Sequence, residues 1–381
     1  MKIAYVTTYD SSDVSAWSGL GLHILRALQE AGFQTESIGN LSDKMIWRWL
    51  LRLKNVYYTK LLSSSYHWQR DPAILMHYTT QVEKLLAAVD HDIVFSPGTL
   101  PIARLKTDKP IVFWTDATFA GMLNYYPGWF NVCGETIKNG NEMEQLALSR
   151  CRIAMYGSEW AANTAIQYYN VDSTKVKVVP FGPNLQSRRT LDEIRRVIET
   201  RQFNVCKLLF IGVNWQRKGG DTALAVAEQL NRRGIKTELH VVGCTPPGVS
   251  PEFVKNHGFI SKKTEEDRQR FDRLFSESHF LVVPSRAECF GLVFSEASSF
   301  GVPSLATRTG GIPSVIHDEK NGQLFPMDEN PRRYCDYIER HMASKEKYRE
   351  LALSSFKEYS TRLNWSSVGD RVHQLIQKFC S

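Results

Sequence analysis

Two glutamates eight residues apart, Glu288 and Glu296, are the side chains whose setting most clearly predicts chemistry. The apolar run Phe280–Val283 before them ends at Pro284, and a helix is predicted over about 291–300. A strand, a turn and a helix in this order place the turn at the carboxyl edge of a parallel sheet, where helix amides attract an anion. Carboxylates repel a phosphate but accept hydrogen bonds from sugar hydroxyls. The segment therefore predicts a ligand with hydroxyl groups flanking a phosphate.

Two neighbouring cations, Arg217 and Lys218, follow the first strand predicted in the second half of the chain. They stand before Gly219 and Gly220, where a helix is predicted to begin. A cation at the amino end of a helix is unfavourable unless an anion lies between them. The pattern therefore predicts that Lys218, with a contribution from Arg217, binds a diphosphate. We expect the Lys218 side chain to be exposed when no ligand is bound.

The first half offers a carboxylate and a glycine loop at comparable strand ends. Asp116 follows a predicted strand over 110–115, so it is the carboxylate of this half best placed to contact a substrate; the alternative is that it only caps a turn. Gly19 and Gly21 lie between the first predicted strand and a helix with leucines at helical spacing. A lone G-x-G is weak evidence, since a tight turn or close helix packing also requires glycine.

The elements that must position these residues alternate between strand and helix in both halves. Short apolar strands are predicted over 2–8, 33–38, 91–96, 110–115, 151–156 and 176–180, and then over 206–213, 237–243 and 280–283. This alternation predicts an α/β protein with a doubly wound parallel sheet in each half. A strongly charged segment within 181–202 is the predicted connection between them.

Together with the turn that follows it, the glutamate segment resembles the E-x7-E signature of the retaining nucleotide-sugar glycosyltransferases of family 4, which have the GT-B fold. Two glutamates at this spacing would alone indicate a solvated helix face. The wider pattern favours the family, and its match is dense over 207–325, thinner over 1–182 and absent from 41–70. The residues that carry the resemblance are Glu288, Phe290, Gly291, Leu292, Glu296, Ala297, Gly301, Val302, Pro303, Gly310, Gly311, Ile312 and Pro313.

The resemblance implies a GT-B protein with two facing Rossmann-like domains, each with a parallel sheet. An acceptor-side domain is expected over 1–183 and a domain that binds the nucleotide-sugar donor over 184–364. The last helix, within 365–381, is expected to cross back onto the first domain.

The resemblance also implies an enzyme that transfers a hexose from a UDP- or GDP-sugar to a hydroxyl of a glycan, a lipid-linked sugar or a small molecule, with retention and without a metal or other cofactor. Glu288 would position the sugar and Glu296 would hold the ribose. The diphosphate would be stabilised by the cations and by main-chain amides. The complete implied site comprises Glu288, Lys218 and Asp116 as catalytic residues, and Gly19, Arg217, Phe290, Gly291, Leu292, Glu296 and Ile260 as donor-binding residues.

Three of these positions depend most on the resemblance. Asp116 would face the sugar at a place where many relatives carry a histidine. Gly19 would lie near the donor phosphates. Ile260 belongs to the segment 258–261, a predicted short strand and turn whose backbone would meet the nucleobase.

Two other classes of protein remain as alternatives. One is a nucleotide-sugar epimerase or a sugar phosphorylase with the same architecture. The other is a non-catalytic, membrane-associated partner of another glycosyltransferase, which the presence of both glutamates together with Lys218 disfavours. A dinucleotide dehydrogenase is disfavoured because Gly19-Leu20-Gly21 lacks a third glycine.

Composition and net charge limit the class of protein further. A chain of 381 residues with 43% hydrophobic and 23% charged residues is typical of a globular protein with two domains. No apolar run is long enough to span a bilayer and the first residues read as a strand, so we expect a cytoplasmic protein. The seven cysteines show no C-x-x-C spacing, which predicts reduced thiols. The net charge of +7 suits an anionic partner, but no nucleic-acid-binding motif is present, so nucleic acid is not expected.

One segment, 43–58, departs from the strand and helix alternation. Ile46, Trp49, Leu50, Leu53 and Tyr57 fall on one helical stripe, whereas Lys44, Arg48, Arg52 and Lys54 lie away from it. A basic amphipathic helix of this kind could lie on an anionic membrane, which would place the protein peripherally at the inner face of that membrane. The alternative, packing of the stripe in the core, is the more common use of such a pattern.

Overall fold

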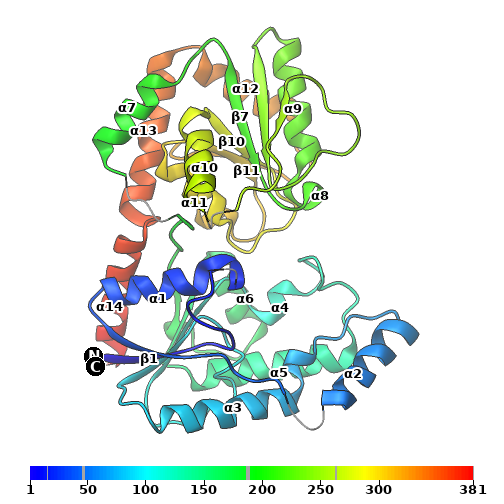
Figure 1. Ribbon diagram of the computed structural model, residues 1–381, viewed down its shortest axis with the longest axis vertical. Helices are drawn as coiled ribbons and strands as arrows, with labels where there is room; N and C mark the ends of the chain where they lie inside the picture. Colours follow the sequence, from blue (N-terminus) through cyan, green and yellow to red (C-terminus); the bar gives the residue numbers. More distant parts are fainter. Residues whose placement is uncertain (15, 45–47, 186–188, 262–263, 381) are drawn as a thin grey trace. The chain divides into compact units, whose positions relative to one another are not determined.

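The computed structural model describes residues 1–14, 16–44, 48–185, 189–261 and 264–380, which fold as two compact units (Figure 1). The first unit comprises Met1–Pro180 together with the segment from Trp365 onward, and the second comprises Phe181–Asn364. Each unit contains one six-stranded sheet whose neighbouring strands are all parallel. The α/β class predicted from the alternation of strands and helices is therefore confirmed.

The sheet of the first unit has the strand order β2-β1-β3-β4-β5-β6. Its central strands are buried along their whole length, as expected when helices cover both faces of a parallel sheet. The elements are β1 (Lys2–Val6), α1 (Leu20–Glu30), β2 (Gln34–Ile38), α2 (Arg48–Val56), α3 (Pro72–Leu86), β3 (Ile93–Ser96), β4 (Ile111–Thr115), α4 (Phe119–Met122), α5 (Gly134–Arg150), β5 (Ile153–Tyr156), α6 (Glu159–Tyr168), β6 (Val176–Val178) and α14 (Trp365–Cys380).

The sheet of the second unit has the order β12-β11-β10-β7-β8-β9, so β10 lies between β11 and β7. Its core is built on large buried side chains such as Phe210, Phe280 and Phe294. The elements are α7 (Leu191–Thr200), β7 (Cys206–Ile211), α8 (Trp215–Lys218), α9 (Gly220–Arg232), β8 (Thr237–Val242), β9 (Val254–Asn256), α10 (Glu265–Glu277), β10 (Phe280–Val283), α11 (Leu292–Ser299), β11 (Ser304–Thr307), β12 (Gly322–Phe325), α12 (Pro331–Met342) and α13 (Lys345–Arg362).

The last helix, α14, belongs to the first unit because it packs along α1 (Figure 1). At their closest approach Gly369 faces the backbone of α1, where an added Cβ would lie 2.9 Å from the carbonyl oxygen of Ala27. His373 Nδ1 lies 2.7 Å from the carbonyl oxygen of Ala31, just beyond the end of α1. The predicted return of the final helix to the first domain is confirmed.

Three local expectations differ from the structure. Residues 258–261 form no strand; the edge strand β9 lies earlier, and its short Val-Lys-Asn sequence has too little apolar pattern to be recognised. The helix predicted from Gly219 is preceded by a separate short helix, α8. The predicted connection 181–202 contains α7, which packs on α13 in the second unit, although residues 186–188 lie outside the described part.

Candidate functional site

Three loops meet at the carboxyl edge of the second sheet because β10 pairs with both β7 and β11. The loop after β7 leads to Lys218, the loop after β10 carries Glu288, and the turn after β11 contains Gly311. The amide of Arg286 donates to the carbonyl oxygen of Arg217 over 2.7 Å, and the amide of Gly311 donates to that of Glu288 over 3.0 Å. The sheet order therefore joins segments that are separated by many residues in the sequence.

Two glycines allow these loops to touch at the backbone. Gly219 has a left-handed backbone, with φ of 76°, and a Cβ there would lie 2.1 Å from the carbonyl oxygen of Pro284. A Cβ at Gly311 would lie 1.9 Å from the carbonyl oxygen of Cys289. Any side chain would force the strand ends apart, so these glycines are required by close packing of the site.

Lys218 and Glu288 form a buried ion pair at the centre of this edge. Lys218 Nζ contacts Glu288 Oε2, and the two residues are only 9% and 8% exposed. Arg217 supports the same carboxylate: its Nη1 lies 3.5 Å from Glu288 Oε2 and donates to the carbonyl oxygen of Ala287 over 3.0 Å. The structure thus brings together three of the residues that the sequence predicted to act together.

The expectation that Lys218 would be exposed without a ligand is wrong. Lys218 ends α8, where a cation suits the helix dipole, and Glu288 on the neighbouring loop supplies the negative charge that the sequence argument assigned to a ligand. A buried cation needs such a partner. The charge at this position therefore does not by itself predict a bound diphosphate.

Two helices begin at this edge without a side-chain cap. Gly219 precedes α9 and Gly291 precedes α11, both in the left-handed conformation, and a glycine offers no side chain to satisfy the first amides. Phe290 is 3% exposed and packs edge-on against Phe181 with ring centroids 5.1 Å apart. Its side chain belongs to the core, so only its main chain and those of Gly291 and Leu292 are suited to contact a ligand.

The remaining predicted residues of this unit lie on neighbouring elements. Glu296 sits within α11 and is 3% exposed, so a carboxylate is held inside the helix that starts at the site. Ile260 is 6% exposed and follows the edge strand β9. The preceding turn is fixed by a 2.8 Å hydrogen bond from the amide of Gly243 to the carbonyl oxygen of Gly258.

In the first unit, Gly19 and Gly21 have different structural roles. Trp17, Ser18 and Gly19 all have left-handed backbones, with φ of 46°, 56° and 79°. That conformation costs about 1–2 kcal/mol for a non-glycine residue, and such strain is concentrated at functional sites. Gly21 is needed for packing, because a Cβ there would lie 2.2 Å from the hydroxyl oxygen of Tyr9.

Asp116 follows β4 and is partly exposed. The cap of the next helix, α4, is supplied by Thr118, whose Oγ1 accepts from the amide of Gly121 over 3.0 Å. Sequence reasoning overlooked Tyr9, whose buried hydroxyl has no hydrogen-bond partner in the described chain and whose pKa burial raises to about 12. Its position just after the first strand was the available signal.

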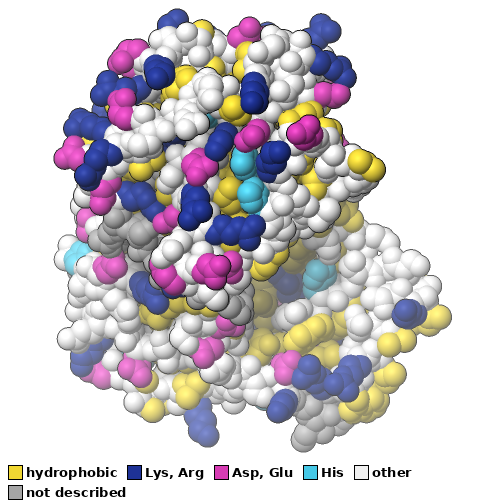
Figure 2. Space-filling view, turned by 45° about the horizontal axis from the view of Figure 1, so that its top comes forward, with side chains coloured by type: hydrophobic (Ala, Val, Ile, Leu, Met, Phe, Trp, Pro, Cys, Tyr) yellow, Lys and Arg dark blue, Asp and Glu magenta, His cyan; other side chains and the backbone are white. Residues whose placement is uncertain are grey.

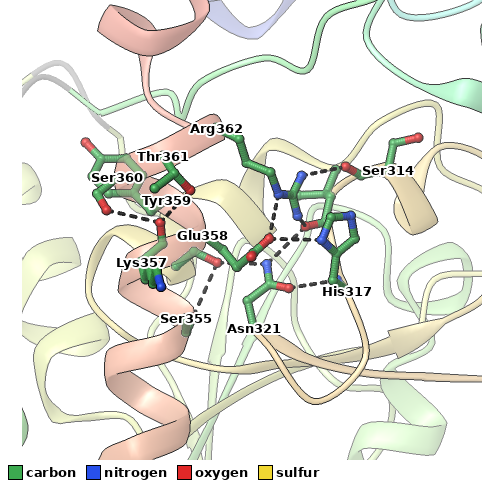
Figure 3. Close-up of polar contacts among 12 residues, drawn as sticks. Ser314, His317, Asn321, Ser355, Lys357, Glu358, Tyr359, Ser360, Thr361 and Arg362 are labelled. Atoms are coloured by element: carbon green, nitrogen blue, oxygen red, sulfur yellow. Dashed lines mark hydrogen bonds and ion pairs between the residues drawn. The ribbon is translucent and has the colours of Figure 1, made fainter.

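A polar network holds the turn after β11 in place (Figure 3). Arg362, the last residue of α13, donates to the carbonyl oxygens of Ser314 and Val315 over 2.8 and 2.6 Å, and its Nε donates to Glu358 over 2.6 Å. His317 Nδ1 lies 3.0 Å from the same Glu358 carboxylate. Because Ser314 closes the turn that starts at Gly311, α13 fixes one wall of the site.

Comparison with known proteins shows that the region around this site is similar to one family. Residues 206–344 match the family described as glycosyl transferases group 1. The matched range contains Lys218, Glu288 and Glu296. Within the second unit these residues therefore resemble the group 1 glycosyltransferases, in agreement with the resemblance found in the glutamate segment.

Individual relatives define how far the likeness extends. The D-inositol 3-phosphate glycosyltransferase of Segniliparus rotundus is 28% identical over 213 residues, which cover 54% of this chain and 47% of that protein. The chain thus spans about half the length of the curated relatives it matches.

Solved structures match over nearly the whole chain. Sucrose-phosphate synthase from Thermosynechococcus elongatus superimposes with a TM-score of 0.69 at 16% identity, covering 99% of this chain and 98% of that one. HepE from Anabaena in complex with UDP-glucose gives 0.60 at 15% identity, with coverage of 99% and 100%. At this identity the likeness shows the fold alone, and the fold is GT-B, as predicted.

Proposed function

We propose that this protein is a retaining glycosyltransferase that moves a hexose from a UDP- or GDP-sugar to a hydroxyl of a glycan, a lipid-linked sugar or a small molecule. The observation that carries the proposal is the buried pair of Lys218 and Glu288, set beside two helix starts that lack side-chain caps. A cation and helix starts without side-chain caps suit a diphosphate, and the carboxylate suits sugar hydroxyls.

The ion pair suggests how the leaving group is stabilised. When the donor binds, its diphosphate competes with Glu288 for the Lys218 ammonium group. As the bond from the anomeric carbon to the phosphate oxygen breaks, negative charge grows on that oxygen and strengthens its contact with Lys218, Arg217 and the amides of 290–292. Glu288 is then available to accept hydrogen bonds from the sugar. The pair thus holds the cation ready before the donor arrives.

The remaining roles follow the family resemblance. The acceptor oxygen attacks from the face that the diphosphate leaves, a new carbon–oxygen bond forms with retention, and the departing phosphate takes the acceptor's proton. We assign Glu296 to the ribose, Gly19 to the donor phosphates, Asp116 to the sugar and the backbone at Ile260 to the base. No metal or other cofactor takes part in this scheme, so a chelator should leave turnover unchanged.

The relatives support the substrate classes. HepE was solved in complex with UDP-glucose, which supports a nucleotide sugar as donor. The Segniliparus rotundus relative is named for transfer to D-inositol 3-phosphate, which supports a hydroxyl as acceptor. We further propose that the protein is cytoplasmic and binds peripherally to the inner face of an anionic membrane. Within the described ranges no helix combines the length and apolar character needed to cross a bilayer.

A thermal-shift panel of UDP-, GDP- and ADP-sugars tests donor binding. A ligand that binds only the native state at 100 times its Kd adds about 2.7 kcal/mol of stability, which raises Tm by several degrees. The stabilising nucleotide sugar is then incubated with candidate acceptors, and NMR of the anomeric proton in the product tests retention. Absence of a shift with every nucleotide sugar, or a product of inverted configuration, would contradict the proposal.

A further inference from the structure

Helix α2 and the π-helical turn η2 (Tyr57–Leu61) present an apolar face to the outside of the first unit. Trp49, Leu53 and Tyr57 are 53%, 57% and 49% exposed. Leu50, Val56, Leu61 and Leu62 are exposed as well. The alternative that this stripe packs in the core is therefore wrong for those of its residues that the structure describes. Ile46, the remaining member, lies outside the described residues.

The opposite face of α2 is ionic and is fixed to the rest of the unit. Lys54 Nζ lies 2.9 Å from Asp71 Oδ2 and 2.5 Å from Glu135 Oε1. The hydroxyl of Tyr58 donates to Glu135 Oε2 over 3.0 Å. Leu51 is the only buried residue of the helix. A helix on a water-exposed surface normally has the reverse arrangement, with its apolar face inward.

A second segment extends this apolar surface. Phe130 is 53% exposed in the loop between α4 and α5. The next residue, Asn131, is held against the segment that follows η2, since its side-chain amide donates to the carbonyl oxygen of Ser63 over 2.5 Å. Its own carbonyl oxygen accepts from the amide of Ser65 over 2.8 Å. Phe130 therefore neighbours the end of η2.

The charged residues of this segment are all basic, although Arg48 and Lys54 are paired with carboxylates from outside it. Residues 44–70 contain six lysines and arginines and no aspartate or glutamate. Two of the cations, Arg52 and Lys60, are exposed beside the apolar side chains. In the view of Figure 2, yellow and dark blue side chains are neighbours at the lower right, where this part of the first unit lies. Exposed tryptophan, tyrosine and leucine combined with basic residues suit the headgroup region of an anionic bilayer.

We propose that α2, η2 and Phe130 form a docking surface for an anionic lipid bilayer. Trp49, Leu53 and Leu61 enter the boundary between headgroups and acyl chains, and Arg52 and Lys60 contact lipid phosphates. The inference does not depend on the transfer reaction, because none of these residues has a part in the candidate site.

Co-sedimentation of the full chain with vesicles tests the surface. Binding should require phosphatidylglycerol, be absent with phosphatidylcholine alone, and weaken as salt rises, because salt screens exposed charges. Trp49→Ser combined with Leu53→Ser should weaken binding at least tenfold, and Arg52→Gln and Lys60→Gln by about fivefold each. Met76→Ser combined with Leu85→Ser is the matched control: both residues are exposed on α3, and binding should not change.

Thermal unfolding of each variant checks its fold, and the single change Arg52→Gln at an exposed position provides a second test if the double variant fails to fold. Equal binding to neutral and anionic vesicles, or wild-type binding by folded Trp49→Ser/Leu53→Ser, would overturn the proposal. Sedimentation velocity without vesicles tests whether the protein self-associates through this surface. Self-association that these substitutions abolish would instead show that the surface joins two copies of the chain.

Discussion

At the scale of single residues, the pair of Lys218 and Glu288 changes the expected cost of substitutions in the site. A sequence argument treats each as a separate ligand-binding group. In the structure each is the counter-charge of the other, and both are buried. Removal of one partner leaves an uncompensated buried charge, which is more damaging than the loss of an exposed ion pair.

Lys218→Ala should therefore lower the free energy of unfolding by about 1–3 kcal/mol, with Arg217 limiting the loss. Urea denaturation measures it, and a double-mutant cycle with Glu288→Gln gives the coupling between the two residues. The control is Lys207→Ala, which breaks a 2.8 Å ion pair with the more exposed Glu277 and should cost about 0–1 kcal/mol. Equal losses at both positions would show that the buried setting of Lys218 has no energetic consequence.

Kinetic measurements should distinguish the roles of Glu288 and Glu296. An interaction that tightens in the transition state affects kcat, whereas one made equally in ground and transition states affects KM. Glu288→Gln should lose mainly kcat and still bind the free nucleoside diphosphate, while Glu296→Gln should weaken that nucleotide by about tenfold, as expected for one lost hydrogen bond of about 1.4 kcal/mol. Calorimetry with the bare nucleotide on both variants measures this, and the opposite pattern would reverse the two roles.

The sequence predicted which residues lie at the edge of the second sheet, but not that Lys218 would be neutralised by Glu288. Their contact joins residues 70 positions apart and depends on β10 lying next to β7. A pattern of strands and helices contains no information about that order. Likewise, the spacing of Gly19 and Gly21 could not show that Gly19 adopts a left-handed backbone whereas Gly21 is required by close packing. The difference lies in the backbone angles and in the position of Tyr9.

At the scale of elements, long and regular segments were predictable and irregular ones were not. The strands predicted from apolar runs were found, whereas the edge strand β9 was placed too late in the sequence and β11 and β12 were not predicted. For α2 the pattern showed an apolar stripe but not its direction. The stripe faces outward because Asp71 and Glu135, which lie 17 and 81 positions from Lys54, attract the ionic face inward.

Helix α5 contributes a buried carboxylate with a clear dependence on pH. Glu144 is 2% exposed and accepts a hydrogen bond from Thr99 over 2.9 Å. Burial raises the pKa of Glu144 from 4.5 to about 7. Between these two values the unfolded chain has released the proton that the folded protein keeps, so the stability contributed by this group falls as pH rises from about 4.5 to 7 and is constant above.

Glu144→Gln should remove this decrease of stability with rising pH. The difference in unfolding free energy between the variant and the wild type should grow by about 3 kcal/mol, in favour of the variant, from pH 4.5 to 7.5. Urea unfolding at several pH values measures it. Glu142→Gln on the same helix is the control. The side chain of Glu142 is 49% exposed, so this substitution should leave the dependence of the unfolding free energy on pH unchanged. A difference curve for Glu144→Gln that stays flat would show that the carboxyl group is not held protonated.

At the scale of the whole molecule, the chain leaves the first unit after Pro180 and returns to it at Trp365. The packing of α14 on the first unit depends on a close contact at Gly369, because a glycine there allows α14 to reach the backbone of α1. Gly369→Ala should therefore destabilise the first unit by about 1–3 kcal/mol, even though alanine favours a helix.

Calorimetry should show this loss in the transition of the first unit and not in that of the second. Gly134→Ala is the matched control. It lies at the start of α5 with open space around it, so its effect should be neutral or slightly stabilising. Equal effects at the two glycines would mean that α14 has room for a side chain against α1.

The return of α14 also has a consequence during synthesis on the ribosome. The second unit, Phe181–Asn364, contains 364 − 181 + 1 = 184 residues, all translated after α1 and before α14. At roughly 5–20 residues per second, this takes on the order of 10–40 s. For that time the nascent chain carries α1 without the helix that covers it, and Phe33, whose ring lies 4.8 Å from that of His373 in the finished protein, lacks this partner. The first domain to be translated is thus the last to be completed.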